Sequence, residues 1–209
     1  DLHEEGAKTY ELGKDFTANG TSHSFDFAYE EQKLENISLA MAGQHQVANA
    51  SLAIMTSLLL QKDYPEVTPD LIKAALAHAS WLGRTEFLMP NLMIDGAHNN
   101  ESVKVLIDLL KSEYADKDIE LLFAAIDTKP IDSMLAQLES VGDLTVTSFE
   151  YPNSVKLDKY PAAYKKVPDF QTWIKNHVSA DKDKLYVITG SLYFISQVRK
   201  WLLERKSNV

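Results

Sequence analysis

The spacing of apolar side chains divides the chain into two parts that meet near residue 86. In residues 1–40 apolar and polar side chains alternate, as in Ser24–Tyr29, and this period of two predicts β-strands. Asn19-Gly20 is typical of the turn between two such strands. Residues 45–60 are apolar on nearly every side, which predicts a helix buried on all its faces.

The segment VTPDLIKAALAHAS predicts a second helix in this first part. Thr68 can cap its first turn, and Pro69 suits the first helical position, where no N–H donor is needed. Asp70 suits the positive end of the helix dipole. The predicted inner face consists of Leu71, Ile72, Ala75, Leu76 and Ala79.

From residue 86 onward, short apolar runs alternate with segments in which apolar side chains recur every three or four residues. This alternation predicts an α/β domain with a mostly parallel sheet that is covered on both faces. The predicted strands are Leu92–Ile94, Ile119–Ile126, Leu144–Phe149 and Leu185–Thr189, and the predicted helices are 103–114, 131–138, 170–177 and 192–202.

The segments that follow the predicted strands are polar. Right-handed crossovers place every strand-to-helix turn on one edge of the sheet, where ligands of such sheets bind. The polar turns are DGAHNN (95–100), DTKP (127–130), EYPN (150–153) and TGSLY (189–193). They are therefore expected to share one edge, and a domain boundary is expected near 82–88.

Composition narrows the class of protein. With 45% hydrophobic and 24% charged residues, the 209-residue chain has an ordinary soluble composition and room for one large or two small domains. The net charge of -9 argues against nucleic acid or an anionic membrane as a partner. The absence of cysteine excludes disulfides and thiolate metal sites, and a cytoplasmic protein is expected. The chain begins at Asp1 without an initiator Met, so a fragment of a longer protein is one interpretation.

Two motifs lie before or at the expected boundary. In AGQHQVANA, His45 and Asn49 share one helix face, either as part of a hydrogen-bonded polar seam or facing a nucleotide base. In WLGRTE, Arg84 is either a solvated charge or a fork of donors that reaches a phosphate group.

Two more motifs lie beyond the boundary. DGAHNN is either a plain turn with an asparagine as helix cap, or a site in which Asp95 and His98 contact a ligand. Its spacing does not make a convincing metal site. In ITGSLYF, Ser191 would lie at a helix N-terminus, which suits a carboxylate or phosphate, or would serve only as the cap. Tyr193 lies off the apolar face set by Leu192 and Ile195.

Together and in this order, the four motifs resemble the folylpolyglutamate synthase / dihydrofolate synthase family of the Mur ligase superfamily. The matching stretches are GQHQVANA, GRTE, MIDGAHNNES and ITGSLYFISQVRKW, which span about 43–201. The resemblance implies that 1–84 are the C-terminal part of a P-loop ATPase (Mur ligase central) domain, and that 85–209 are a Rossmann-like C-terminal domain. It also implies that the P-loop, the Mg²⁺ ligands and a catalytic lysine lie upstream.

Enzymes of this family join L-glutamate to a folate carboxylate through an acyl phosphate made from ATP, and some are also dihydrofolate synthases. The resemblance implies that Asn49 lies near the adenine of bound ATP and Arg84 at its terminal phosphates. It also implies that Asp95 lies at the ribose of ATP and at the hinge between the two domains. No metal ligand is assigned to this chain. It is expected to be a monomer, and to be inactive alone because it contains no G-x-x-x-x-G-K-[ST].

The resemblance further implies that His98, Ser191 and Tyr193 contact the incoming glutamate, with Arg84 and His98 as the catalytic pair. Two departures from the family pattern are visible. Asn100 stands where Pro usually follows Asp-Gly-Ala-His-Asn, and AIDTKP replaces the usual Ala-Asp-Lys-Asp, so a role for the lysine of that loop is in doubt.

Two alternatives stay open. One is a Mur-type ligase that adds an amino acid to a cell-wall precursor, although the Gln after His45 and the TGSLYF segment favour folate. The other is a non-catalytic nucleotide-binding module, which would explain the polar edge without any chemistry.

Overall fold

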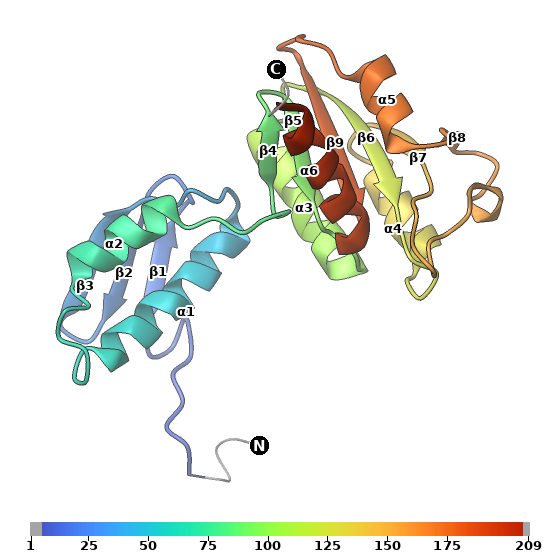
Figure 1. Cartoon of the computed structure of the whole chain (residues 1–209). Helices are drawn as coiled ribbons and strands as arrows, with labels where there is room; N and C mark the ends of the chain where they lie inside the picture. Colours follow the sequence, from blue (N-terminus) through green and yellow to red (C-terminus); the bar gives the residue numbers. More distant parts are fainter. Residues whose placement is uncertain (1–5, 207–209) are drawn as a thin grey trace. The chain divides into compact units, whose positions relative to one another are not determined.

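The computed structural model describes residues 6–206, and the chain divides into two compact units, Asp1–Ser80 and Trp81–Val209 (Figure 1). The first unit has a three-stranded antiparallel sheet in the order β1-β2-β3 and two helices that pack against it. Its elements are β1 (Thr17–Gly20), β2 (Phe25–Tyr29), β3 (Gln32–Ile37), α1 (Gln44–Leu60) and α2 (Pro69–His78).

The helices of the first unit bury one side only. Thr68 caps α2 as predicted, and its side chain accepts a hydrogen bond from the N–H of Leu71 at 3.3 Å. The prediction that α1 is buried on all faces is wrong, because Leu52 and Leu60 are 50% and 44% exposed. The predicted inner face of α2 is also partly wrong, since Leu71 is 54% exposed and Ile72 is its buried residue. Apolar composition alone does not show which helix face meets the sheet.

The second unit contains a six-stranded sheet in the order β4-β5-β9-β6-β7-β8. Every neighbouring pair is parallel except β4 and β5, so the predicted α/β class with a mostly parallel sheet is confirmed. The strands are β4 (Glu86–Met89), β5 (Leu92–Asp95), β6 (Asp118–Ala124), β7 (Asp143–Val146), β8 (Lys165–Lys166) and β9 (Lys184–Gly190).

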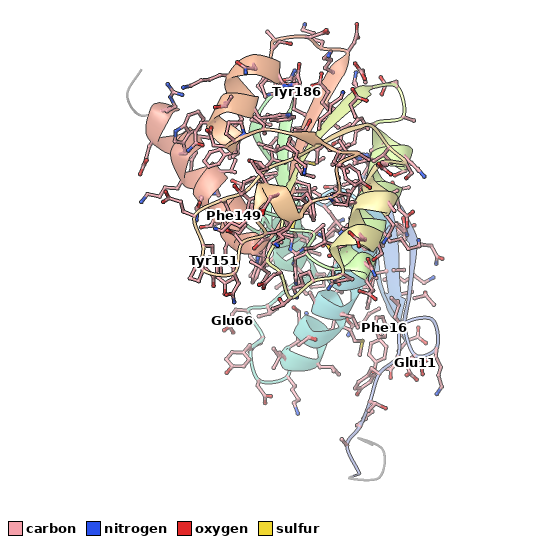
Figure 2. The ribbon with its side chains drawn as sticks, turned by 90° about the vertical axis from the view of Figure 1, so that its right-hand side faces the viewer. Glu11, Phe16, Glu66, Phe149, Tyr151 and Tyr186 are labelled. Atoms are coloured by element: carbon pink, nitrogen blue, oxygen red, sulfur yellow. The ribbon has the colours of Figure 1, made fainter. Side chains whose placement is uncertain are left out.

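Helices cover both faces of this sheet (Figures 1 and 2). The helices are α3 (Asn100–Glu113), α4 (Ile131–Leu138), α5 (Phe170–His177) and α6 (Leu192–Lys206), with a 3₁₀ turn at Leu157–Lys159. Along β6, Leu121 and Phe123 pack with residues of α3 and α4, while Leu122 and Ala124 pack with residues of α5 and α6. A strand buried on both faces appears in the sequence as a continuous apolar run, and this run is why β6 was predicted.

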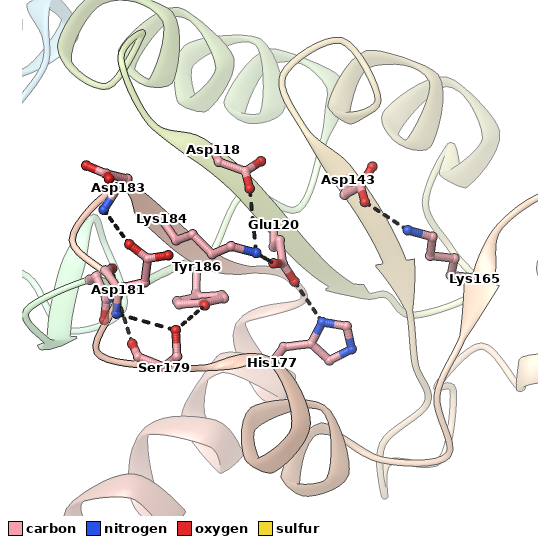
Figure 3. Close-up of polar contacts among 11 residues, drawn as sticks. Asp118, Glu120, Asp143, Lys165, His177, Ser179, Asp181, Asp183, Lys184 and Tyr186 are labelled. Atoms are coloured by element: carbon pink, nitrogen blue, oxygen red, sulfur yellow. Dashed lines mark hydrogen bonds and ion pairs between the residues drawn. The ribbon is translucent and has the colours of Figure 1, made fainter.

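A charged network lies at the edge of the sheet opposite the polar turns, where β6 and β9 begin (Figure 3). The Glu120 carboxylate accepts hydrogen bonds from Lys184 of β9 and, at 2.7 Å, from Nδ1 of His177 at the end of α5. Burial alone would raise the pKa of Glu120, but the bonds from Lys184 and His177 outweigh it and hold the pKa below its ordinary value. This network fastens α5 to the sheet at the edge remote from the polar turns.

Candidate functional site

The carboxyl ends of the central strands meet at one edge of the sheet. Asp95, the last residue of β5, is paired in register with Thr189 of β9, which is paired in turn with Phe123 of β6. Gly190 is paired with Ala124, the last residue of β6. The turns that begin at Asp95, beyond Ala124 and at Gly190 therefore share one edge, as the crossover rule predicted.

Gly190 makes the turn from β9 into α6 possible. Its φ of +121° lies in the region that side chains rarely adopt, and a Cβ there would lie 2.1 Å from the carbonyl oxygen of Ala124. The next residue, Ser191, donates its N–H to the same oxygen at 2.9 Å. This close approach fixes Ser191 at the start of α6.

Three of the sequence motifs come together within the second unit. The N–H of Gly96 donates to the carbonyl oxygen of Gly83 at 2.8 Å, which joins the DGAHNN turn to the GRTE segment. A Cβ on Gly96 would lie 2.2 Å from Cδ2 of Leu192, so this turn also touches the first turn of α6. DGAHNN and TGSLY were expected to share one edge of the sheet, and these contacts bring the GRTE segment to the same edge.

Asp95 lies at the centre of this group and is 6% exposed. Its Oδ2 accepts the N–H of Thr85 at 2.8 Å. Burial raises the pKa of Asp95, while the Thr85 N–H and the Arg84 guanidinium oppose that rise. A partly desolvated carboxylate at a strand end is suited to accept hydrogen bonds from a ligand hydroxyl.

Arg84 is half-buried beside this carboxylate. Its Nη1 donates to the carbonyl oxygen of Gly96 at 3.4 Å. None of the ion pairs among residues 6–206 includes Arg84. A guanidinium has five N–H donors, so most of this fork stays available for an anion such as a phosphate group.

His98 is held in one orientation by the turn in which it lies. Its Nδ1 is 2.8 Å from the carbonyl oxygen of Gly96, and because a carbonyl only accepts, Nδ1 carries the proton. Nε2 is then the ring nitrogen left for a ligand. The next residue, Asn99, caps α3 by accepting the N–H of Ser102 at 2.8 Å, which confirms that an asparagine of this motif serves as the cap.

Ser191 directly precedes α6, and Tyr193 lies in its first turn. Ser191 is 4% exposed, and its Oγ accepts the N–H of Tyr193 at 3.3 Å, so it takes part in capping and keeps its own hydroxyl proton to donate. Tyr193 is 51% exposed, and its ring stacks on Tyr151 with the centroids 4.1 Å apart. The prediction that Leu192 belongs to the apolar face is wrong: Leu192 is 44% exposed, and Phe194 is buried in its place.

Two buried hydroxyls at this edge were not among the predicted site residues. Oγ1 of Thr85 and Oγ1 of Thr189 are buried and have no hydrogen-bond partner among the described residues. Thr189 is paired in register with Asp95, and Thr85 donates its N–H to the same residue. Thr85 also has a φ of +43°, which is rare for a β-branched residue. Unpaired buried hydroxyls and strained backbone both collect at ligand sites.

The remaining predicted site residue, Asn49, belongs to the first unit. It is exposed on α1, and its Nδ2 donates to Oε1 of Gln46 at 3.2 Å. Gln46 is buried, so a polar seam exists on this helix. The contact of Asn49 with adenine stays a prediction.

Within the part of the chain that the structure describes, no three His, Asp or Glu side chains come together as a metal site. In the same residues no helix has both the length and the apolar character that a membrane span needs.

A mostly parallel sheet with helices on both faces and polar turns at its carboxyl edge defines a Rossmann-like domain, a class of fold in which ligands bind at that edge. No protein-family model matches the chain. Among curated proteins, the dihydrofolate synthase/folylpolyglutamate synthase of Bacillus subtilis is 32% identical over 85% of this chain, and the folylpolyglutamate synthase of Lacticaseibacillus casei is 29% identical over 87%. Each match covers 44% of the relative, so the chain spans less than half the length of these relatives.

Solved structures agree on the fold. Escherichia coli FolC in complex with ADP matches 99% of this chain and 50% of its own, with a TM-score of 0.84 and 23% identity. The folylpolyglutamate synthase of Mycobacterium tuberculosis complexed with ADP and AMPPCP matches 96% of this chain and 51% of its own, with a TM-score of 0.82 and 21% identity. The comparisons confirm the predicted resemblance to the folylpolyglutamate synthase / dihydrofolate synthase family, of which this chain is a relative.

Proposed function

We propose that this chain forms the C-terminal half of an ATP-dependent folylpolyglutamate synthase, which adds L-glutamate to a folate carboxylate. The observation that carries the proposal is the meeting of Arg84, Asp95 and Ser191 at one sheet edge, in a chain 32% identical to a Bacillus subtilis enzyme of that name. Dihydrofolate synthase activity is a second reaction of the same type that the name of this relative suggests.

The proposed reaction has two steps. A carboxylate oxygen of folate attacks the γ-phosphorus of ATP, which gives an acyl phosphate and ADP. The amine of glutamate then attacks the acyl carbon, and phosphate leaves as the amide forms. Both steps demand cationic donors around the phosphoryl group and an amine held rigidly in place.

In this proposal Arg84 neutralises charge on the transferring phosphoryl group with the N–H donors that Gly96 does not use. Asp95 and Asn49 bind ATP, Asp95 through a ribose hydroxyl and Asn49 through the base. Thr189, whose hydroxyl has no partner among the described residues, lies next to Asp95 in register and suits the same ligand.

The incoming glutamate is assigned to His98, Ser191 and Tyr193. The Ser191 hydroxyl and the first N–H groups of α6 suit a carboxylate, because a helix N-terminus carries partial positive charge. His98 presents Nε2, which can accept a proton from the ammonium group before the amine attacks.

The described residues hold no cluster of three His, Asp or Glu side chains that could bind a metal ion, and the 209 residues contain no P-loop motif. The proposal therefore assigns the phosphate cradle and metal to parts of the enzyme outside this chain, and residues 1–209 alone should not turn over ATP.

The test is glutamate-dependent release of phosphate from ATP by the full-length protein with a reduced folate present. Release that needs both folate and glutamate supports the proposal. Omitting either substrate is the control. Phosphate release from ATP that does not depend on folate or glutamate would reject the proposal, and so would the absence of any phosphate release.

A Mur-type ligase is the second candidate. The UDP-N-acetylmuramate--L-alanine ligase of Hydrogenobaculum is 31% identical, but over 53% of this chain and 24% of its own length. The same assay with UDP-N-acetylmuramate and L-alanine separates the two. A non-catalytic module would bind ADP and release no phosphate with either substrate pair.

A further inference from the structure

A hollow lies on the same edge of the sheet as Asp95 and Ser191, beyond the ends of β6 and β7. Its volume is about 780 Å³, within the range of about 300–1,000 Å³ typical of small-molecule sites. One wall is residues 127–133, at the start of α4, and the other is residues 152–159, from the long connection after β7.

The two walls are fastened to each other and to the sheet. Ile126 forms an antiparallel bridge with Ser154, and the N–H of Asp127 donates to the carbonyl oxygen of Asn153 at 2.9 Å. The Tyr160 hydroxyl, which is buried, accepts the N–H of Ala125 at 3.1 Å. The hollow is therefore a defined part of the fold, although a long irregular segment forms one side of it.

Three lysines line this hollow, namely Lys129, Lys156 and Lys159. None of them takes part in an ion pair among residues 6–206. Lys156 donates to Oγ of Ser154 at 3.3 Å. Ser154 is 6% exposed, so a buried hydroxyl keeps its own proton to donate beside the lysines.

The hollow also offers groups that accept hydrogen bonds. The carboxylates of Asp127 and Asp132 line it together with the lysines. Its occupant should therefore carry several negative charges and also N–H donors. A polyphosphate has the charges but no N–H donors, so it would leave the two aspartates without hydrogen-bond partners.

A chain of γ-linked glutamates meets both requirements, because each unit carries one free carboxylate and one peptide N–H. We infer that this hollow binds the γ-glutamyl tail of a folate that already carries several glutamates. This inference rests on the proposed function and adds a site for the part of the substrate that precedes the reacting carboxylate.

The position of the hollow agrees with this assignment. Asp127 follows Ala124 by three residues, and Ala124 is paired with Gly190, the residue before Ser191. At about 3.3 Å per extended residue, the wall begins roughly 10 Å from the end of β6. A tail whose last unit reacts near Ser191 can therefore place its earlier carboxylates among the lysines.

The test compares long and short substrates in the full-length protein. The double variant Lys156→Gln/Lys159→Gln should raise KM for a triglutamyl folate about 2- to 30-fold, the effect of losing two partly exposed ion pairs. KM for monoglutamyl folate, ATP and glutamate should stay unchanged. The matched control is Lys175→Gln/Lys182→Gln, which removes the same charge from exposed positions on α5 and just before β9.

Calorimetric binding of p-aminobenzoyl-γ-triglutamate, with the monoglutamate and tripolyphosphate as comparisons, separates failure of this inference from failure of the proposed function. Weaker binding of the triglutamate by the Lys156/Lys159 variant supports the tail site even where no ligase activity is found. Equal binding by variant and wild type, no preference for triglutamate over monoglutamate, or equally strong binding of tripolyphosphate would overturn it.

Discussion

Replacing Gly190 by alanine should destabilise the second unit by about 2–4 kcal/mol, the sum of a backbone contribution and a hydrogen-bond contribution that the structure separates. An alanine at a φ of +121° costs about 1–3 kcal/mol. Its Cβ would lie 2.1 Å from the carbonyl oxygen of Ala124, and real Cβ contacts do not fall below 3.0 Å, so the strands must separate by at least 0.9 Å. That shift breaks the 2.9 Å bond from Ser191 N–H to Ala124, worth about 1 kcal/mol.

Two other glycines serve as matched controls. Gly13 has a φ of +88° with no atom within 4 Å of a Cβ, so Gly13→Ala carries the backbone cost alone, about 1 kcal/mol. Gly142 lies outside the left-handed region, but its Cβ would lie 2.1 Å from the carbonyl oxygen of Ile119. Gly142→Ala therefore carries the contact alone, and Gly190→Ala should exceed both.

Urea unfolding measures these differences. All three tryptophans, Trp81, Trp173 and Trp201, lie in the second unit, so their fluorescence reports its unfolding. Far-UV circular dichroism follows the first unit for the Gly13 variant. A Gly190→Ala variant that loses no more stability than Gly13→Ala would show that the close approach of β9 to β6 is not as described.

The remaining predictions concern chemistry and pH, and the first two use the full-length protein. Arg84→Ala should lower kcat by about 10²- to 10³-fold with an unchanged circular dichroism spectrum, and unaltered kinetics would reject its phosphate role. His98→Ala or Ser191→Ala should raise KM for glutamate more than KM for ATP, whereas a change confined to ATP would refute the glutamate assignment. Glu120→Gln should destabilise the second unit by about 1 kcal/mol at pH 7 in urea unfolding. Because the folded pKa of Glu120 is lowered, this difference should shrink as pH falls below 4.5, and a constant difference down to pH 3 would contradict it.

Local signals in the sequence predicted much of the fold. Strands β5, β6 and β9 were found because burial on both faces gives continuous apolar runs. The caps at Thr68 and Asn99 were readable because capping depends on residues three positions apart. The shared edge of the polar turns followed from the handedness of crossovers alone.

Features that depend on contacts between distant residues were not predictable in this way. The outward position of Leu52 depends on which face of α1 meets the sheet. The stacking of Tyr193 on Tyr151 joins the first turn of α6 to a loop 42 residues earlier in the sequence. The predicted strand 144–149 ends at Val146, where its pairing with both β6 and β8 ends. Periodicity carries no information about such partners.

The polar residues at the sheet edge differ in how much hydrogen-bonding capacity the fold uses. The side chain of Asn99 is occupied by the capping of α3, so a structural role accounts for it. Among the described residues, the side chains of Arg84 and His98 each make one hydrogen bond, to the carbonyl oxygen of Gly96. This bond orients each side chain, while most guanidinium donors and one imidazole nitrogen stay available. Folding stability gives no reason to keep such groups half-buried with their capacity unused. The capacity left over at this edge, rather than the polarity of the motifs, is therefore the physical argument for a ligand there.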